Sequence, residues 1–546
     1  PVTLDLPRAE EGLQDMNADY VVVGAGSAGC VMASRLSEDG SKVVLLEAGP
    51  KDRHPMIHIP AGIRSLLHHP VVNWNYSSEP EANTGGRRIH WPRGKVLGGS
   101  SSINGMLYVR GNRADYDGWA QRGCRGWDFD SVLPYFMKSE SYRNEGDDEV
   151  RGRSGPLKVE DYRTILPLTH KFVEAAQQAG FAFNPDLNGK DQEGVGYSQM
   201  TRRGRWRGST ARTYLAEAKG RTNLETVTEA VATKLLFEGK RCVGVAYRQG
   251  GVDKEVRAGR EVILSGGAIN SPHLLQVSGV GPAEHLRSIG VDVLHDLPGV
   301  GSNLSDHYVT RVSHRVKDLI SINELARGVR VAREALRFVF RGNGALTFGV
   351  TSAQIFCRSR EGLSSPDLQL LFTPASYGTK VIGELEREPG MTVAVCPVRP
   401  ESRGTIMAGS ADPLEKAVIR PNYLSAEGDA YVMLAGIRHT QRIFAAPAMA
   451  QHSVAELQPG EPIESVDDVL AFAQRNGASI YHPVGTCKMG DDPMAVVDAR
   501  LKVHGVDGLR VVDASIMPTV TTGNTNAPTI MIGEKAAAMV REDVSG

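Results

Sequence analysis

Hydrophobic and polar positions near the start of the chain predict short strands joined by glycine-rich turns and helices. The apolar run 20–23 leads into Gly24-Ala25-Gly26-Ser27-Ala28-Gly29, a helical stretch follows, and a second apolar run, 43–46, ends at Glu47. Short apolar runs bounded by glycine indicate strands. The order strand, turn, helix, strand predicts a βαβ unit, and we expect regular structure to begin at Ala18.

The rest of the chain alternates between two textures. Three further stretches combine glycine with short apolar runs, at residues 91–111, 260–304 and 478–541. The segment 311–400 differs, because it is patterned as a helix near 321–340 and then has strand-like runs, at 367–372 and 391–395. We therefore predict a discontinuous nucleotide-binding domain, interrupted by a second domain with its own sheet.

Length and composition describe an ordinary globular protein. The 546 residues exceed one ordinary hydrophobic core, so two or more domains are expected. A net charge of −1 gives no electrostatic case for nucleic acid or an anionic membrane. One local basic cluster, Arg202-Arg203-Gly204-Arg205-Trp206-Arg207, is either a solvated loop or a contact to a cofactor phosphate or anionic substrate.

The six cysteines are scattered and form no CxxC pair, so we expect neither a disulfide framework nor a metal site. This usage favours a reducing, cytoplasmic compartment. No apolar run is long enough for an integral membrane span. The polar first 17 residues lack the apolar core of a signal peptide, and we interpret 1–17 as an N-terminal arm.

The βαβ unit has the chemistry of a dinucleotide site. Gly24 permits a tight turn, Gly26 lets the backbone approach a pyrophosphate, and Gly29 allows the helix to pack closely on the strand. The helix N-terminus offers free N–H groups to phosphate. Glu47, about 20 residues on, is placed to accept ribose hydroxyls. The motif does not distinguish NAD from FAD.

Two more glycine-rich segments are candidate ligand loops. Residues 93–105 read RGKVLGGSSSING, with many backbone donors that could hold a phosphate or the polar edge of a flat ring, although a surface turn is the alternative. Residues 266–281 follow a strand at 261–264. There we expect Ser271 to cap a helix whose first residue is Pro272, and Gly279 to end it.

The C-terminal region holds the last group of motifs. Tyr481-His482-Pro483-Val484-Gly485-Thr486 is followed by residues 508–515 and by Gly523-Asn524-Thr525-Asn526-Ala527-Pro528-Thr529. We expect Asn526 to cap the helix that follows, with Pro528 in its first turn. That helix would direct its positive N-terminus at whatever lies before it.

Taken together, these motifs resemble the glucose–methanol–choline (GMC) oxidoreductases. The resemblance runs from Ala18 to Val540 and includes the segments 94–117 and 267–281, and the loop 299–307. The sequences YHPVGTCKMG and GNTNAPTIMIGEKAA are most similar to those of bacterial alcohol and choline dehydrogenases.

The resemblance implies a fold of the α/β plus α+β class. A Rossmann-like FAD-binding domain, of the p-hydroxybenzoate-hydroxylase type, would be joined to a substrate domain built on an antiparallel sheet. We expect the FAD domain to comprise 18–165, 221–310 and 475–546. The substrate domain would comprise 166–220 and 311–474.

The resemblance also implies residue roles. His482 and Asn524 would be catalytic, with Asp513 and Ala514 near the ribityl–pyrophosphate region and Ala232 at the adenine. Because Ile103 stands where some members carry a flavin-linked histidine, FAD should be non-covalent. The full expected cofactor set is Gly24, Gly26, Ser27, Ala28, Gly29, Glu47, Ala48, Arg93, Val96, Gly98, Gly99, Ser100, Ser102, Ile103, Asn104, Gly105, Met106, Ala232, Gly266, Asp513, Ala514, Asn526, Pro528 and Thr529.

The expected reaction is oxidation of a small alcohol to an aldehyde or ketone, with His482 as base. The electron acceptor would be O2, or a quinone or artificial dye, and a quinone would go with peripheral membrane association. A dehydrogenase is favoured over an oxidase. A redox-silent lyase, a photodecarboxylase and a nicotinamide enzyme are further alternatives. Phe348, Phe372 and Tyr377 are candidates for the pocket, although most such residues belong to a hydrophobic core. We expect His54, His58, His68 and His69 in structural or surface positions.

Overall fold

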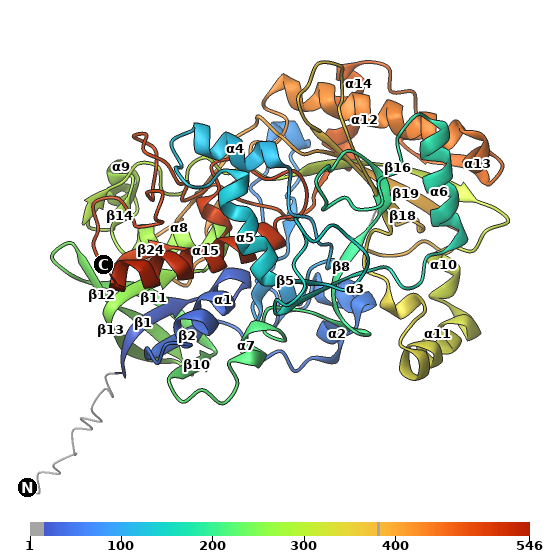
Figure 1. Cartoon of the computed structure of the whole chain (residues 1–546). Helices are drawn as coiled ribbons and strands as arrows, with labels where there is room; N and C mark the ends of the chain where they lie inside the picture. The colour runs from blue at the N-terminus through green and yellow to red at the C-terminus, as the bar shows by residue number, and fades with distance from the viewer. Residues whose placement is uncertain (1–15, 379–382, 546) are drawn as a thin grey trace, which may run out of the picture.

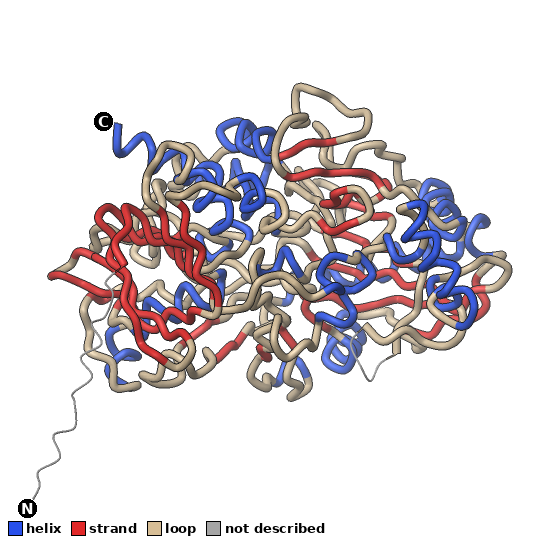
Figure 2. Tube along the Cα trace, turned by 90° about the horizontal axis from the view of Figure 1, so that it is seen from below, coloured by secondary structure: helices blue, strands red, loops and turns tan. Residues whose placement is uncertain are grey.

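The computed structural model describes residues 16–378 and 383–545 and contains two large sheets. Figure 2 shows them toward opposite ends of an elongated molecule, with loops and short helices between them. The first sheet has the order β10-β2-β1-β13-β12-β11, with β24 paired to β13. The second has the order β22-β16-β19-β18-β17-β7, with β23 paired to β16.

The first sheet is parallel at its centre. β1 lies between β2 and β13, and both pairings are parallel, as is that of β10 with β2. β11, β12 and β13 continue the sheet as antiparallel strands. The strands are β1 (Met16–Val23), β2 (Val43–Glu47), β10 (Leu224–Thr228), β11 (Ala230–Glu238), β12 (Arg241–Gln249), β13 (Val252–Leu264) and β24 (Leu509–Val511).

Helices cover this sheet because its central strands are apolar throughout. Val21, Val22, Val44 and Leu45 are completely buried. α1 packs against α15, and α15 also packs against α5, as Figure 1 shows. The helices of this half are α1 (Ser27–Leu36), α4 (Arg113–Gln121), α5 (Phe129–Ser139), α7 (Tyr214–Glu217), α8 (Gly267–Val277), α9 (Ala283–Ser288) and α15 (Asn526–Ser545).

The second sheet is antiparallel in all its pairings. Its strands are β7 (Gly194–Tyr197), β16 (Tyr308–Val316), β17 (Ala353–Cys357), β18 (Leu368–Thr373), β19 (Gly390–Pro397), β22 (Ser453–Gln458) and β23 (Ala478–Ser479). Helices α6 (Pro167–Gln178), α12 (Glu427–Ala445), α13 (Pro447–Ala450) and α14 (Val466–Asn476) lie over it (Figure 1). Its core includes Phe172 stacked on Phe372, with ring centroids 4.1 Å apart.

Smaller elements connect the two halves. Short strands form two-stranded pairs and one four-stranded sheet, β5-β6-β8-β9. They are β3 (Tyr76–Ser77), β4 (His90–Trp91), β5 (Glu140–Tyr142), β6 (Leu157–Asp161), β8 (Gln199–Arg203), β9 (Trp206–Arg207), β14 (Val280–Gly281), β15 (His295–Asp296), β20 (Thr405–Met407) and β21 (Val418–Arg420). The remaining helices are α2 (Pro55–His58), α3 (Ile63–Leu66), α10 (Ile322–Leu325) and the longer α11 (Gly328–Arg341), with 3-10 turns at Pro60–Gly62, Ala82–Thr84, Gly99–Ser102, Ala345–Thr347 and Ala514–Ile516.

The predicted fold class and βαβ unit are confirmed, although β1 begins at Met16 rather than Ala18. The predicted arm 1–17 otherwise lies outside the described residues. The expected helix near 321–340 is divided into α10 and α11, because Gly328 adopts a φ of +57° that a continuous helix does not allow.

The prediction that Pro272 starts a helix is wrong. α8 begins at Gly267, and Pro272 lies inside it. A proline there removes the N–H that would bind the carbonyl of Ala268. Thr486 supplies the missing donor, because its Oγ1 binds the Ala268 oxygen at 2.6 Å. Ser271 therefore does not cap a helix at Pro272. Its side-chain oxygen accepts the N–H of Gly266, just before α8, at 3.0 Å, and its hydroxyl donates to Asp513 Oδ2 at 2.6 Å.

The predicted domain ranges stay a prediction, and one strand and two strand pairings cross them. β16 spans the expected boundary at 310/311. β23, placed in the FAD domain by its position in the sequence, pairs with β16 of the antiparallel sheet. The four-stranded sheet joins β5 and β6 to β8 and β9, which the ranges separate.

Within residues 16–378 and 383–545, no helix is both long and apolar enough to cross a bilayer.

Candidate active site

A cavity of about 1020 Å³ reaches from the glycine-rich end of the first sheet to the second sheet. Most of the residues predicted from sequence line it. They are His482, Asn524, Gly24, Gly26, Ser27, Ala28, Glu47, Ala48, Arg93, Gly99, Ser100, Ile103, Asn104, Gly105, Met106, Ala232, Gly266, Asp513, Ala514, Asn526 and Thr529. The exceptions lie behind the lining, at Gly29, Val96, Gly98, Ser102 and Pro528.

The first glycine motif has the geometry of a ligand cradle. Gly24 has a φ of +97°, and a Cβ there would lie 2.5 Å from the Ser265 carbonyl oxygen. A Cβ on Gly29 would lie 1.9 Å from the Gly24 oxygen, so only glycine lets α1 approach the turn. Gly26 differs, because its nearest such neighbour is 3.8 Å away and its backbone faces the cavity. This open side fits an incoming pyrophosphate.

Glu47 closes the same end of the cavity. Its two carboxylate oxygens accept the N–H groups of Ala25 and Gly49, each at 2.9 Å. Burial raises the pKa of this carboxyl group to about 7. A carboxylate has about four acceptor positions, so Glu47 can still accept hydrogen bonds from ribose hydroxyls. The residue therefore fits the role that its place in the sequence predicts.

The second glycine-rich loop packs directly on the first. A Cβ on Gly99 would lie 2.6 Å from the Gly26 Cα. Within the loop, the Ser100 hydroxyl accepts the Gly94 N–H at 3.1 Å. The Asn104 side chain accepts the Met106 N–H at 3.0 Å. The two loops together form one wall, which is why segments about 70 residues apart in sequence serve one ligand.

The basic cluster at 202–207 explains how Asn104 is held. Arg207 is buried and donates to the backbone oxygen and the side-chain oxygen of Asn104, at 2.6 and 2.7 Å. Burial lowers the pKa of Arg207 to about 9. Arg202 is also buried and binds the Gly204 carbonyl. A solvated loop is therefore the wrong interpretation for these two arginines.

The C-terminal segments complete the nucleotide end. Asp513 accepts the Gly267 N–H at 2.8 Å, the Ser271 hydroxyl and the Ser515 N–H. This ties the segment at 513–515 to the start of α8. Asn526 is the first residue of α15 rather than its cap, and its Oδ1 accepts the Ser27 hydroxyl at 2.7 Å. The N-termini of α1 and α15 thus meet beside the cavity, where both favour negative charge.

His482 lies at the opposite part of the cavity. Its backbone N–H donates to Asp306 Oδ1 at 2.7 Å, and Ser479 and Tyr423 donate to Oδ2 of the same carboxylate. Asn524 Nδ2 lies 3.1 Å from His482 Nε2. The sequence therefore predicts correctly that these two side chains, 42 residues apart, come together. The buried Oδ1 of Asn524 has no hydrogen-bond partner among the described residues.

His307 was missed by the sequence analysis. Its Nδ1 lies 2.9 Å from His482 Nδ1, and its Nε2 lies 3.2 Å from the carbonyl of Val398. Because a carbonyl only accepts, His307 carries its proton on Nε2, and its Nδ1 must accept from His482. His482 then carries its proton on Nδ1, and the lone pair of its Nε2 accepts from the Asn524 amide. The segment 299–307 was recognised, but nothing in its pattern assigned a role to this side chain.

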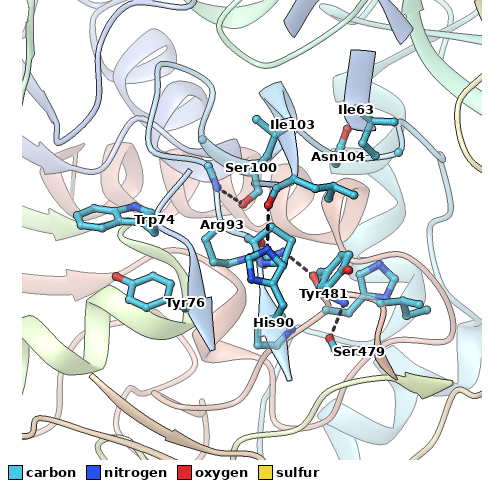
Figure 3. Close-up of a pocket in the computed structure, with 18 of the residues that line it drawn as sticks. Ile63, Trp74, Tyr76, His90, Arg93, Ser100, Ile103, Asn104, Ser479 and Tyr481 are labelled. Atoms are coloured by element: carbon cyan, nitrogen blue, oxygen red, sulfur yellow. Dashed lines mark hydrogen bonds between the residues drawn. The ribbon is translucent and has the colours of Figure 1, made fainter. Parts of the chain in front are cut away.

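The surroundings keep both imidazoles neutral. Burial lowers the pKa of His307 to about 4. Burial, followed by the neighbouring His307 and Arg93, lowers the pKa of His482 well below its ordinary value. Arg93 donates to the Tyr481 carbonyl at 2.6 Å, and burial lowers its own pKa to about 10. Figure 3 shows Arg93 between the Tyr481–Ser479 side of the cavity and Trp74.

The predicted aromatic pocket residues are correct in part. Phe348 and Tyr377 line the cavity. Phe372 does not, because its ring stacks on Phe172 in the core of the second sheet. The paired histidines are engaged with other rings: His54 contacts His69, and His68 stacks on His90. In the described part of the chain, no group of three or more His, Cys, Asp or Glu is placed to bind a metal ion.

A parallel nucleotide sheet, a glycine-lined cavity and a buried neutral histidine fit an oxidoreductase that uses a dinucleotide cofactor. Comparison with known families identifies this one: the chain belongs to the GMC oxidoreductases, whose N- and C-terminal models match residues 18–309 and 400–533. The chain is 43% identical to an alcohol dehydrogenase [acceptor] of Pseudomonas putida, over 96% of this chain and 95% of that protein. It is 45% identical to human mitochondrial choline dehydrogenase, over 96% of this chain and 89% of that protein.

Solved structures agree with this assignment. A pyridoxine 4-oxidase from Mesorbium loti superposes with a TM-score of 0.88 at 30% identity, covering 96% of this chain and 99% of that one. A formate oxidase variant from Aspergillus oryzae RIB40 gives 0.90 at 26% identity, covering 97% and 98%. The protein is an oxidoreductase that acts on CH–OH donors, and its cofactor is FAD, which resolves the choice left open by the βαβ unit.

Proposed function

We propose that this enzyme oxidises an alcohol to an aldehyde or ketone, with His482 Nε2 as the base that accepts the hydroxyl proton. The contact of 3.1 Å between His482 Nε2 and Asn524 Nδ2, inside the cavity, carries the proposal. A substrate oxygen within hydrogen-bond reach of both side chains, in place of their direct contact, would give its proton to His482 and accept a hydrogen bond from Asn524. When bound, FAD supplies the two-electron acceptor that removal of hydride from the alcohol carbon requires.

The energetics explain why both residues are needed. A free alcohol has a pKa near that of water, ~15.7, and an ordinary histidine is near 6.5, so proton transfer alone is uphill by about 12 kcal/mol. The lowered pKa of His482 widens this gap. The proton must therefore leave as the carbon–hydrogen bond breaks, or as negative charge on oxygen is stabilised. One amide donor such as Asn524 contributes roughly 3 kcal/mol to that stabilisation.

The charges in the cavity favour an uncharged alcohol over a quaternary ammonium alcohol such as choline. Arg93 and Arg311 both line the cavity. Trp74 and Tyr76 could face a cation, but lysines already occupy those positions, with Lys95 4.7 Å from the Trp74 ring and Lys416 5.8 Å from that of Tyr76. Apolar lining near the second sheet, including Leu371 and Ala394, fits an aliphatic or benzylic chain.

We further propose that the enzyme is a dehydrogenase that passes electrons to a quinone or dye. The Pseudomonas putida relative at 43% identity is named an alcohol dehydrogenase [acceptor], which supports this acceptor, and the solved oxidases are more distant, at 26–30%. Brucella relatives at 44% identity are named oxygen-dependent choline dehydrogenases, so the acceptor needs the direct test below. Ile103 at the cavity supports non-covalent FAD. Acid precipitation should then release all of the flavin into the supernatant, and flavin left in the pellet would contradict this.

An anaerobic panel of alcohols, read by bleaching of the flavin absorbance, tests the proposed reaction. Uncharged primary alcohols should bleach the flavin, and choline should do so much more slowly. No bleaching by any alcohol would contradict the reaction, and faster bleaching by choline would contradict the substrate class. Stopped-flow mixing of the reduced enzyme with air tests the acceptor, because rapid reoxidation would identify an oxidase.

A further inference from the structure

Helix α11 is amphipathic in the reverse of the usual sense. Its apolar residues Val329, Leu336, Val339 and Phe340 are 86%, 58%, 56% and 77% exposed, whereas Glu334 is 3% exposed. The spacings of seven, ten and eleven residues from Val329 place all four side chains on one face. That face therefore points to solvent while the charged Glu334 points to the protein. Figure 1 shows α11 at the periphery of the molecule.

Arginines flank this apolar face. Arg330, Arg333, Arg337 and Arg341 occur at intervals of three or four residues, so they share the adjoining side of the helix. Arg330 pairs with Glu324 and Arg337 with Glu334, each at 2.9 Å. Within the described residues, Arg333 and Arg341 have no ion-pair partner, which leaves positive charge beside the exposed apolar surface.

The basic cluster at residues 202–207 adds Arg205 and Trp206 to the same surface. Trp206 is 45% exposed, and its ring lies edge-on to Phe338 of α11, with centroids 5.2 Å apart. Arg205 donates to the Phe338 carbonyl at 3.0 Å and so binds the last turn of the helix. Tryptophan and arginine beside an apolar face are typical of helices that lie in a membrane–water interface.

We propose that α11, with Arg205 and Trp206, docks this enzyme on a bilayer surface that contains anionic lipid. An exposed contiguous apolar patch marks an interaction site, and the flanking arginines match anionic headgroups. The chain's net charge of −1 conceals this site, because the arginines are concentrated on one helix. A bilayer matches both features at once, because its acyl region takes the apolar stripe and its anionic headgroups pair with the arginines.

The same helix borders the catalytic cavity. Ala326, Val331 and Val350 line the cavity and are also exposed, so one of its mouths lies beside α11. Docking would place that mouth at the lipid surface, where an apolar ligand dissolved in the bilayer could enter without crossing water. The proposal does not rest on the proposed reaction, since membrane binding is measured without turnover.

Flotation of the FAD-loaded enzyme with lipid vesicles tests the proposal. The wild-type protein should float with vesicles that contain phosphatidylglycerol, and much less with phosphatidylcholine alone or at high salt. Leu336→Asp combined with Phe340→Asp should weaken binding at least tenfold, as should Arg333→Glu with Arg341→Glu. Val252→Asp, which is 58% exposed on β13, and Arg125→Glu with Arg287→Glu are matched controls and should bind as wild type.

Several results would overturn docking. Docking is wrong if the wild type does not float with vesicles, or if the α11 variants bind vesicles as well as the wild type does. It is also wrong if the control variants lose as much vesicle binding as the α11 variants. Sedimentation of the protein without vesicles, which measures its oligomeric state, provides one further test. If the wild type is a dimer that the aspartate pair converts to a monomer, and neither binds vesicles, the face is an interface between two copies. Because the substituted side chains are exposed, retained flavin absorbance should show that each variant is folded.

Discussion

His307 Nδ1 and His482 Nδ1 lie 2.9 Å apart, and only one of these nitrogens can carry the proton between them. The Val398 carbonyl determines which one, because it can only accept and so places the single ring proton of His307 on Nε2. His307 is therefore a positioning residue: it holds His482 as the tautomer whose Nε2 is unprotonated and can act as base. It does so without charge, since its own pKa is lowered to about 4.

Removing His307 should impair catalysis through His482. We expect His307→Ala to lower kcat/KM by roughly 10–100-fold, the usual effect of losing a side chain that orients a functional histidine. His307→Asn should restore part of the rate, because its amide oxygen can accept from His482 Nδ1. A purely structural role predicts no such rescue, so equal rates in the two variants would contradict the positioning role.

The rate should depend on pH through His482. Burial, and the neighbouring His307 and Arg93, lower its pKa, so the neutral base persists below the ordinary histidine value of 6.5. The kcat/KM profile should be flat at neutral pH and should fall only in acid well below 6.5. The unfolded chain binds that proton more readily, so folding stability should also decrease as pH falls through this range. A loss of rate centred at or above the ordinary value would contradict the assignment.

Asn524 should contribute both a hydrogen bond and a neutral environment. We expect Asn524→Ala to slow flavin reduction about a hundredfold, equivalent to roughly 3 kcal/mol. Asn524→Asp would place a carboxylate near His482 Nε2, now 3.1 Å from the amide nitrogen. A nearby negative charge raises a histidine pKa, so the acid limb of the pH profile should move to higher pH. An unchanged profile in the Asp variant would argue against direct contact.

Gly29 should be needed for FAD retention. Gly29→Ala would place a Cβ 1.9 Å from the Gly24 oxygen, so α1 or the glycine turn must move. Overpacking of this kind costs about 1–3 kcal/mol, and we expect a lower Tm and loss of bound flavin. Gly118→Ala in α4 is the matched control, because nothing lies within 4 Å of its Cβ position. Equal flavin content in the two variants would contradict a cradle at Gly24–Gly29.

Local patterns predicted most of the site, and contacts distant in sequence account for what was missed. The turn at Gly24, the strand before Glu47 and the pairing of His482 with Asn524 followed from motifs. The hydrogen bond by which Thr486 compensates for Pro272 could not be predicted, because a contact across more than 200 residues leaves no local pattern. The same holds for Arg207: only the fold shows that this cation is buried against Asn104 rather than solvated.

The sequence also could not predict that the apolar face of α11 points to solvent. Its periodicity predicted a helix correctly but not which face is buried, since either side of an amphipathic helix can pack. The buried Glu334 and the exposed Phe340 determine the orientation. Helical period alone would have placed the apolar side inward.

The most direct test of the central claim is anaerobic flavin reduction by an alcohol in His482→Ala. If His482 is the base, the rate of bleaching should fall at least a hundredfold, while the flavin spectrum before mixing shows that FAD remains bound. Bleaching at the wild-type rate, with FAD bound, would remove His482 from the reaction.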